Sequence, residues 1–535
     1  MIREMTTENA PLLRPPRWWE GAALYQVYVR SFQDSDDDGY GDLQGLSSRL
    51  GYLADLGVDG VWLSPTMPSP DTDWGYDVSD YYGVHPELGT MQDLDQLIKG
   101  AKAAGMEVLL DLVPNHTSSR HPWFVEAIGD PASPRREYYV FCDPGPDGGP
   151  PNNWLDSTGE CAWALDEASG QYYLHNFLDT QPDLNWWNPA VHAEFERVLR
   201  FWFDRGVAGF RIDVAHGLYK DAELRDNPDA EIDSAQARFG REPVYSANRP
   251  ETHEVFRAWR KLADTYDPGR LLLGETWVWD PERLASYTGD DDELQLAFNF
   301  RFALAPFSAP HLAAVVESSI ATLGEACPVW TASNHDIGRF ASHWGEGDVR
   351  RARLGLMLLC SLPGTVVLYY GDELAMTDVA VPLERQRDPM TKGNRGGKEE
   401  RDRGRTPMPW SSAPNGDFTA PGVEPWLPLG PLPAGSVAEQ AADPTSPLSL
   451  TRALLALRRQ HLAPGIAAYQ TLSVDEEHLV YRVGDLVVAL NWVDRPGVLK
   501  VPSGRVLMST TLERAGDDVE GSIHLAPYEG VIIGR

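Results

Sequence analysis

Positive charge is scarce in this chain. Its 535 residues include 46 Lys and Arg against 79 Asp and Glu, which gives a formal net charge of −33 at pH 7. Nucleic acids and anionic membrane surfaces repel a protein of that charge. The composition therefore excludes nucleic acid and membranes as partners, and it favours a small neutral molecule as the substrate.

Cysteine and long apolar runs are scarce too. The four cysteines form no CxxC pair and stand beside no histidine cluster, which excludes a disulfide scaffold and predicts reduced thiols. No apolar run approaches the ~20 residues of a membrane-spanning helix. Residues 1–19 lack the apolar core of a signal peptide. We therefore expect a cytoplasmic protein.

Apolar and aromatic side chains, by contrast, are plentiful. The chain is 42% hydrophobic, with 18 Trp and 20 Tyr, which is enough for a large core. The rings either fill that core or line a site that stacks on flat apolar faces such as those of sugars. Composition leaves both interpretations open.

Short apolar runs typical of buried strands alternate along the chain with patterns of helical spacing. Repeated strand–helix units indicate a parallel sheet with right-handed crossovers. The eight units found here predict an α/β fold, a (β/α)₈ or TIM barrel. The predicted strands cover 23–32, 58–65, 106–116, 206–217, 270–277, 294–300, 328–336 and 365–374, and helices are predicted, for example, over 43–57, 91–105 and 189–206.

Two further parts are predicted outside the barrel. Segment 112–187 follows the third strand and is too long for a plain loop, so we expect a small inserted domain there. Segment 448–535 reads as a last helix followed by the short alternating runs of an all-β sandwich. The barrel then takes 1–111 and 188–447, with extended loops over 378–447 after the eighth strand.

Polar residues gather at the carboxyl ends of the predicted strands, where barrels of this kind place their active sites. So many charges at strand ends are not expected from structural ion pairs alone. The candidates are Asp73, Trp74, Tyr76 and Asp77 after the second strand, Asn115 and His116 after the third, Arg211 and Asp213 on the fourth, Glu275 after the fifth, and Asn334, His335 and Asp336 after the seventh.

The arginine and the carboxylate of "GFRID" stand two residues apart on one strand. Arg211 and Asp213 therefore point to the same face, and we expect the cation to lower the pKa of Asp213 and keep it ionised. Glu275 follows an apolar run, and a glutamate in apolar surroundings tends to stay protonated. One ionised and one protonated carboxyl form the acid–nucleophile pair of glycoside hydrolysis.

Four short motifs make the expectation specific. "DLVPNH" (111–116), "GFRIDVAH" (209–216), "GETW" (274–277) and "SNHD" (333–336) resemble, in order, the four sequence regions of the α-amylase superfamily, glycoside hydrolase family 13. The resemblance covers essentially the whole chain. It implies a retaining mechanism through a covalent glucosyl–enzyme ester.

The resemblance also implies a role for each matching residue. Asp213 would be the nucleophile, Glu275 the general acid and base, and Asp336 the stabiliser of the transition state. Arg211 would orient Asp213. His116 and His335 would hydrogen-bond the sugar that is cleaved.

Further motifs narrow the branch. "WGYDVSDYYGV" (74–84), "YYLHNFLDTQPDLNWWNP" (172–189), "YYGDEL" (369–374) and "RDRGRTPMPW" (401–410) resemble α-glucosidases and oligo-1,6-glucosidases, which are exo-acting.

In that branch, residues matching Asp77 and Arg401 close the bottom of the glucose pocket. Phe177 and Gln181 match lining residues, and Tyr76 would stack beneath the sugar. The plainer alternatives are that Tyr76 and Phe177 fill the core, and that Arg401, or Arg405 in a shifted register, forms a structural ion pair.

An acidic stretch near the amino terminus has the spacing of a cation-binding loop. In "DSDDDGYGD" (34–42), the carboxylates of Asp34, Asp36, Asp38 and Asp42 and the carbonyl of Tyr40 are the candidate ligands. The resemblance implies a structural Ca²⁺ or Mg²⁺ and no organic cofactor. The alternative is a solvated acidic turn.

The exact substrate is left open. Val214 follows the nucleophile at a position that bears on linkage in this family, and valine there often accompanies α-1,6 activity. The wording of "DVAHG" and "GETW", however, resembles α-glucosidases of actinobacterial type, which implies maltose and short malto-oligosaccharides as substrates. The alternatives are an oligo-1,6-glucosidase, a sucrose- or trehalose-acting isomerase or transferase, and a catalytically inactive barrel used for binding. The sequence carries no signal of the oligomeric state.

Overall fold

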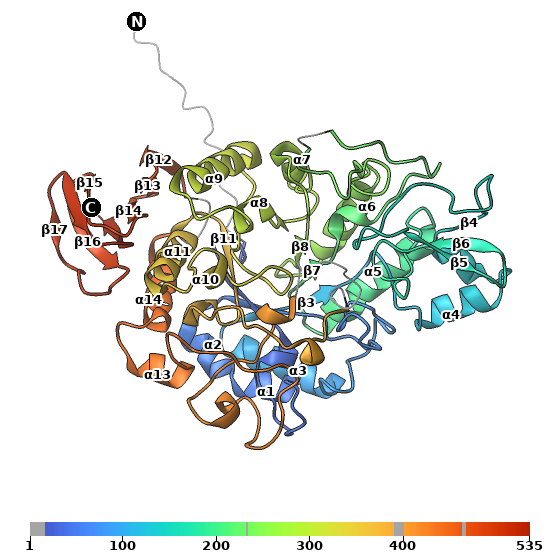
Figure 1. Cartoon of the computed structure of the whole chain (residues 1–535), viewed down its shortest axis with the longest axis horizontal. Coiled ribbons are helices and arrows are strands. Elements are labelled where there is room, and N and C mark those ends of the chain that lie inside the picture. Colours follow the sequence, from blue (N-terminus) through green and yellow to red (C-terminus); the bar gives the residue numbers. More distant parts are fainter. Residues whose placement is uncertain (1–16, 232–233, 390–400, 463–466, 535) are drawn as a thin grey trace, which may run out of the picture.

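The described part of the chain is a parallel barrel with two smaller β-rich parts attached (Figure 1). The computed structural model describes residues 17–231, 234–389, 401–462 and 467–534. Its main sheet has eight strands in the order β10-β11-β1-β2-β3-β7-β8-β9. Because β1 pairs in parallel with both β2 and β11, the first and last strands of the barrel lie side by side. The expected TIM barrel is confirmed.

The barrel strands alternate with helices along the chain. The strands are β1 (Ala23–Val27), β2 (Gly60–Leu63), β3 (Glu107–Leu112), β7 (Gly209–Ile212), β8 (Leu271–Gly274), β9 (Leu296–Ala297), β10 (Val329–Trp330) and β11 (Thr365–Tyr369). The helices after them include α1 (Leu43–Ser48), α2 (Leu50–Leu56), α3 (Met91–Ala103), α5 (Pro189–Asp204), α6 (Thr252–Ala263), α7 (Pro281–Ser286), α8 (Phe300–Ala303), α9 (Ala309–Leu323), α10 (Phe340–His343), α11 (Val349–Ser361) and α14 (Pro447–His461).

Some elements differ from the sequence-based expectation. The helix predicted over 43–57 is two helices, because Arg49 leaves helical geometry at φ −103° and ψ 6°. The first strand ends at Val27, since the chain turns into a 3₁₀ helix at Val29–Ser31. The sixth and seventh strands, β9 and β10, have only two residues each. The predicted strands were too long because their polar ends already belong to the loops that carry the site.

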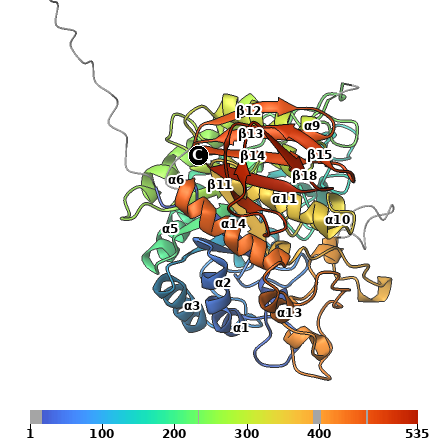
Figure 2. The same cartoon turned by 90° about the vertical axis from the view of Figure 1, so that its left-hand side faces the viewer.

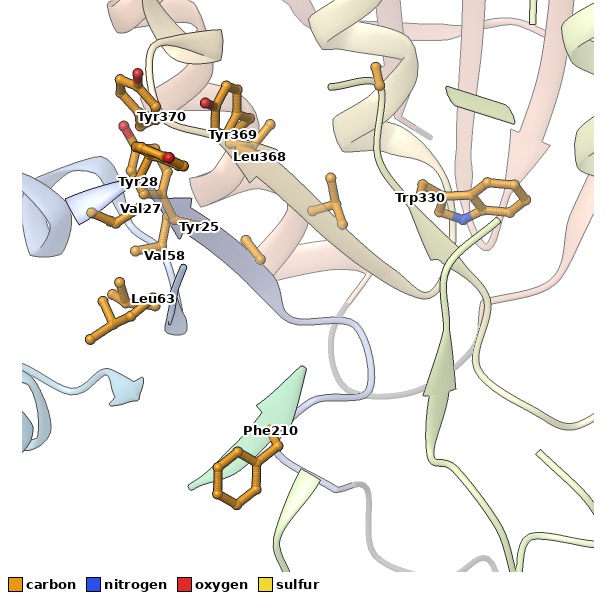
Figure 3. Packing of buried hydrophobic residues seen from close by; sticks show 14 of the residues in the cluster. Tyr25, Val27, Tyr28, Val58, Leu63, Phe210, Trp330, Leu368, Tyr369 and Tyr370 are labelled. Carbon is orange, nitrogen blue, oxygen red and sulfur yellow. The ribbon is translucent and has the colours of Figure 1, made fainter. Parts of the chain in front are cut away.

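Alternate residues of the strands enter two separate cores. Trp62, Leu109 and Leu271 belong to a buried cluster inside the barrel. Tyr25 and Phe210 face outward and pack with the helices (Figure 3). Gly209 pairs with both Leu109 and Leu271 and therefore points inward. Because residues of one parity share a face, Arg211, two residues further along β7, points inward as well.

Two smaller β-rich parts flank the barrel on opposite sides (Figure 1). One lies within the segment expected to be inserted and contains β4 (Phe141–Cys142), β5 (Trp163–Asp166) and β6 (Gln171–Leu174), packed over the pair Trp154 and Trp163. The helix α4 (Pro122–Gly129) precedes it. The segment boundaries themselves stay predictions.

The carboxyl-terminal part is the expected β-sandwich. A six-stranded and a two-stranded sheet share one buried cluster that includes Val487, Leu499 and Ile523, and α14 lies beside them (Figure 2). The strands are β12 (Tyr469–Val474), β13 (His478–Val483), β14 (Leu486–Asn491), β15 (Gly497–Lys500), β16 (Gly504–Ser509), β17 (Asp518–Val519), β18 (Ser522–Leu525) and β19 (Gly530–Gly534). The loops after the eighth strand include α13 (Val437–Ala442).

The close packing inside the barrel gives a test at Gly209. A Cβ added there would lie 2.3 Å from the Leu271 carbonyl oxygen on the neighbouring strand. We expect Gly209→Ala to destabilise the chain by about 1–3 kcal/mol through overpacking, measured as a lower urea midpoint. Gly51→Ala is the matched control, because its Cβ would meet nothing within 4 Å, and alanine is favoured in a helix by about 0.5–1 kcal/mol. Equal midpoints for Gly209→Ala and wild type would contradict this packing.

Candidate active site

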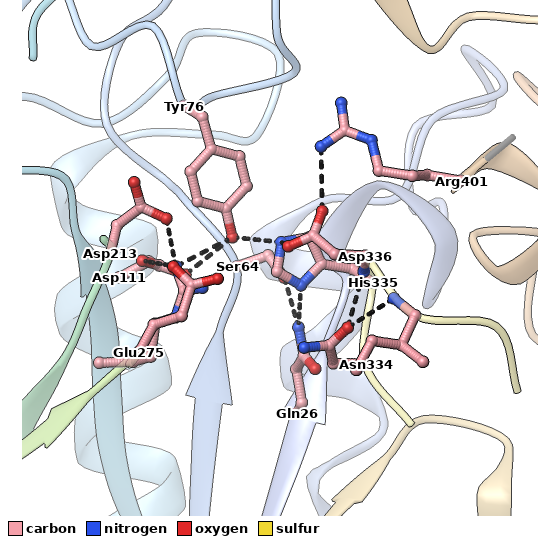
Figure 4. Close-up of polar contacts among 12 residues, drawn as sticks. Gln26, Ser64, Tyr76, Asp111, Asp213, Glu275, Asn334, His335, Asp336 and Arg401 are labelled. Carbon is pink, nitrogen blue, oxygen red and sulfur yellow. Dashed lines mark hydrogen bonds and ion pairs between the residues drawn. The ribbon is translucent and has the colours of Figure 1, made fainter. Parts of the chain in front are cut away.

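A cluster of polar side chains, among them Asp111, Asp213 and Glu275, lies at the carboxyl ends of the strands (Figure 4). Arg211 is at its centre, because it pairs with all three carboxyls. It is fully buried, and its Nη1 donates to Asp111 Oδ1 at 2.9 Å and to Asp213 Oδ1 at 2.7 Å. Its Nη2 lies 2.8 Å from Glu275 Oε2. A buried cation needs such partners. The arginine therefore brings the two predicted reacting carboxyls and a third one together.

The backbone after β7 links the nucleophile candidate to the acid candidate. Val214 lies in the left-handed region at φ 45°, where a β-branched residue is strained. In this conformation its N–H donates to Glu275 Oε2 at 2.9 Å. The turn therefore holds Asp213 and Glu275 in one fixed arrangement.

The charge state of Asp213 differs from the expectation. Burial raises the pKa of Asp213 well above its usual range, Arg211 opposes this shift, and repulsion by Glu275 and Asp111 adds to it. Burial also raises the pKa of Asp111, to about 6. The expectation of a lowered pKa at Asp213 was wrong because burial and the neighbouring carboxyls together outweigh the one arginine. The buried carboxyls Asp111 and Asp213 therefore hold a proton more readily than exposed ones.

The pKa of Asp336 is shifted in the opposite direction. Burial alone would raise its pKa, but His335, Arg401 and Arg405 together hold it well below its usual range. Arg401 Nη1 and Arg405 Nη2 reach Asp336 Oδ1 at 3.0 and 3.1 Å. Both arginines of the sequence-based alternative thus bind this carboxylate, which stays ionised.

Tyr76 and His335 form a rigid wall of the site. Their rings stack at 5.2 Å and 2°, and the Tyr76 hydroxyl donates to Asp111 Oδ2 at 3.0 Å. The amide of Gln26 donates to His335 Nδ1 at 2.8 Å. The proton of the imidazole is therefore on Nε2, which lies 3.1 Å from Asp336 Oδ2 and faces the site.

Arg401 pairs with the acidic loop that follows β2. Its Nη2 binds Asp73 Oδ1 at 2.9 Å. The Asp77 carboxylate instead accepts from the Ser69 hydroxyl at 2.6 Å and from the backbone N–H of Thr72 and Asp73 at 3.0 Å. Asp77 shapes the loop, and Asp73 carries the charge that faces Arg401.

The remaining predicted binding residues converge on the same place. His116 Nε2–H donates to the Tyr76 carbonyl at 3.0 Å, and its ring lies 5.1 Å from that of Phe177. Gln181 donates to Asp73 Oδ2 at 3.2 Å. Burial lowers the pKa of His116, so it is a neutral hydrogen-bonding group. The structure brings the inserted segment and the barrel loops together here.

Two functional contacts were missed by the sequence reasoning. Asp111 was seen only as part of a motif, although it stands opposite Arg211 in the register of β3 and β7. Asp388 binds Arg401 through both side-chain oxygens, at 3.0 and 2.7 Å. A buried carboxylate at the end of an apolar strand was the available signal for Asp111. Nothing in the sequence pointed to Asp388.

The acidic loop gathers three of its predicted ligands. One carboxylate oxygen from each of Asp34, Asp36 and Asp42 lies within 4.8 Å of the others. Asp38 is turned toward the backbone N–H of Tyr40, at 2.8 Å. Burial and the neighbouring carboxylates raise the pKa of Asp36. Clustered carboxylate oxygens of this kind suit a hard divalent cation.

Comparison with known proteins decides the family. Residues 26–465 match the model of the α-amylase catalytic domain. The chain belongs to the α-amylase family. A probable α-glucosidase of Rhizobium meliloti (strain 1021) is 41% identical over 479 residues, 86% of each chain. An oligo-1,6-glucosidase of Parageobacillus thermoglucosidasius is 34% identical over 96% of this chain and 98% of that protein.

Solved structures agree with this assignment. An α-glucosyl transfer enzyme superposes with a TM-score of 0.91 at 37% identity, over 98% of this chain and 100% of its own. The trehalulose synthase of Pseudomonas mesoacidophila MX-45 gives 0.89 at 30% identity, over 98% and 100%. This α-amylase-family chain is a glycoside hydrolase acting on O-glycosyl bonds, of the branch that contains α-glucosidases and oligo-1,6-glucosidases. Within its described residues, no helix is both long and apolar enough to cross a membrane.

The shared arginine gives a test by stability. Arg211→Met leaves buried carboxyls without their cation, and we expect a loss of about 3–5 kcal/mol near neutral pH. The loss should shrink from about pH 8 to about pH 5, because protonation then removes the uncompensated charges. Urea midpoints at both pH values measure this. Arg350→Met is the control, since Arg350 is 50% exposed and such pairs contribute about 0–1 kcal/mol. A loss that is equal at both pH values would refute the charge argument.

Proposed function

We propose that this enzyme is an exo-acting, retaining α-glucosidase that releases glucose from the non-reducing end of maltose and short malto-oligosaccharides. The observation that carries the proposal is the Arg211 cluster, in which Asp213 and Glu275 are held on one buried cation. Its substrate would be a small neutral oligosaccharide.

The geometry supports a division of roles between the two carboxyls. Substrate binding would complete the site, and Asp213 would attack the anomeric carbon as the carboxylate while Glu275 gives its proton to the departing oxygen. Glu275 would then take a proton from water, which resolves the ester and returns glucose with its configuration kept. Asp336, ionised by its two arginines, would stabilise the positive charge of the transition state.

The contacts around Arg401 support exo action. Arg401 ties Asp73 and Asp336 together, and Gln181 binds the other oxygen of Asp73. These fixed polar groups would take the hydroxyls of a terminal glucose and leave no room for a longer chain beyond it. We propose Asp73 in the pocket role that the sequence suggested for Asp77.

The fate of the glucosyl ester is the second part of the proposal. A sugar hydroxyl can replace water in the second step, which gives transglucosylation, and the similarity to an α-glucosyl transfer enzyme favours this side activity. An oligo-1,6-glucosidase or a sucrose isomerase uses the same carboxyls and is the alternative, supported by relatives with those names. Val214 borders the acceptor side next to Glu275.

The test of this function is a substrate panel. Wild type should hydrolyse p-nitrophenyl α-glucoside, and among disaccharides should act fastest on maltose, ahead of isomaltose, sucrose and trehalose. Asp213→Asn should lower the rate by at least about 10⁴-fold, because the nucleophile is lost. Asp37→Asn, an exposed carboxylate outside the cluster, is the control and should keep the wild-type rate. Activity that survives in Asp213→Asn would overturn the nucleophile assignment, and isomaltose as the best substrate would establish the alternative.

We also propose that the loop over 34–42 binds a structural Ca²⁺ or Mg²⁺ through Asp34, Asp36 and Asp42, with Asp38 and the Tyr40 carbonyl as further ligands. The three converging carboxylates support this. A bound cation would offset their mutual repulsion and stiffen the loop before α1, whose first turn Asp42 caps.

Metal removal tests that proposal. A chelator should lower the melting temperature, and added Ca²⁺ should restore it, because a cation at about 100 times its Kd stabilises the folded state by about 2.7 kcal/mol. Asp36→Asn should abolish the response. Asp37→Asn should keep it, since Asp37 is not among the three converging carboxylates. A melting temperature that ignores both chelator and Ca²⁺ would refute the site.

A cytoplasmic location completes the proposal. It is supported by the four cysteines, all of which are free thiols.

A further inference from the structure

Trp277 stands two residues after Glu275 and contacts it. The indole Nε1–H donates to Glu275 Oε1 at 2.8 Å. The ring of Trp277 stacks on that of Phe300, with centroids 4.1 Å apart and planes 7° apart. Phe300 is buried in the cluster inside the barrel. The direction of the indole N–H is therefore set by the core.

The two oxygens of Glu275 have different surroundings. Oε2 faces the Val214 N–H at 2.9 Å and Arg211 Nη2 at 2.8 Å. A cation and an N–H on one oxygen favour negative charge there, so the acid proton is carried by Oε1. Oε1 is the oxygen that meets Trp277.

We infer that Trp277 is a positioning residue for the acid and base Glu275; this rests on the proposed function. When Glu275 acts as the acid, its Oε1–H bond breaks and the proton passes to the glycosidic oxygen as that oxygen leaves the anomeric carbon. The electron pair of the broken O–H bond stays on Oε1. The indole then donates to a charged oxygen, a stronger hydrogen bond than before, so Trp277 helps the transition state more than the bound substrate.

The same contact serves the second step. Oε1, now a carboxylate oxygen held by the indole, takes the proton of the water or sugar hydroxyl that attacks the ester. Because Trp277 is only partly buried while its ring is fixed on Phe300, it also borders the side from which that acceptor enters.

Trp277→Phe is the decisive variant, because phenylalanine keeps a ring for Phe300 and removes the N–H. Nitrophenolate leaves without help from an acid, whereas the glucose of maltose needs the proton. We expect kcat/KM on maltose to fall roughly ten- to hundredfold, as for a lost hydrogen bond to a charged group. On p-nitrophenyl α-glucoside it should fall by at most about threefold.

Two further variants complete the test. Trp279→Phe makes the same change two residues along the chain and should behave as wild type on both substrates. Phe300→Leu keeps the indole but removes the ring on which it stacks. Activity on maltose should again fall more than activity on p-nitrophenyl α-glucoside, but by less than in Trp277→Phe. This variant replaces Trp277→Phe in the test if Trp277→Phe does not fold. An equal loss on both substrates, or no loss on maltose, overturns the inference. A wild type inactive on both substrates would instead overturn the proposed function, and the inference with it.

Discussion

A single buried arginine holds this active site together. Arg211 has almost no contact with solvent, and three carboxyls from three strand ends lie within 2.9 Å of it. Removing a guanidinium from water costs several kcal/mol unless its partners are well placed. The parallel register places them, because Asp111 stands directly opposite Arg211 and Glu275 follows the neighbouring strand. The inward-pointing positions of a few strand residues thus determine both the packing of the barrel core and the placement of the carboxyls around Arg211.

The carboxyls on the strands were predictable, and those in the loops were not. Asp213 and Glu275 follow apolar runs whose ends must meet at one rim, so the sequence places them. Asp73 and Asp77 lie four residues apart in a loop, and spacing cannot rank them. The chain turns between them at Trp74 (φ 50°) and Gly75 (φ 103°). That turn aims Asp73 at Arg401, and Asp77 accepts the loop's own N–H groups.

The charge states of Asp213 and Asp336 could not be predicted from the sequence, for a related reason. In the sequence, Arg211 and Asp213 suggest one cation beside one carboxylate, an arrangement that lowers the pKa of the carboxylate. In the folded chain Asp111, Asp213 and Glu275 all pair with the same arginine. Burial and repulsion together therefore raise the pKa of Asp213. At Asp336 two arginines meet one carboxylate, and the balance is reversed. Burial and the local balance of cations and carboxyls, which only the tertiary structure provides, therefore set opposite pKa shifts at Asp213 and Asp336.

In the proposed function, Val214 would bear on both specificity and catalysis. A valine at φ 45° stores strain of about 1–3 kcal/mol, and the network around Arg211 over-determines the turn enough to keep it. In this conformation the Val214 N–H donates to Glu275 Oε2. The acid proton of Glu275 would then be carried by Oε1, the oxygen that accepts a hydrogen bond from Trp277. In the proposed function, a side chain at this position would act on the acceptor sugar in two ways, by its own bulk and by the orientation it imposes on the acid. Linkage preference and proton transfer would then be coupled through this one strained turn.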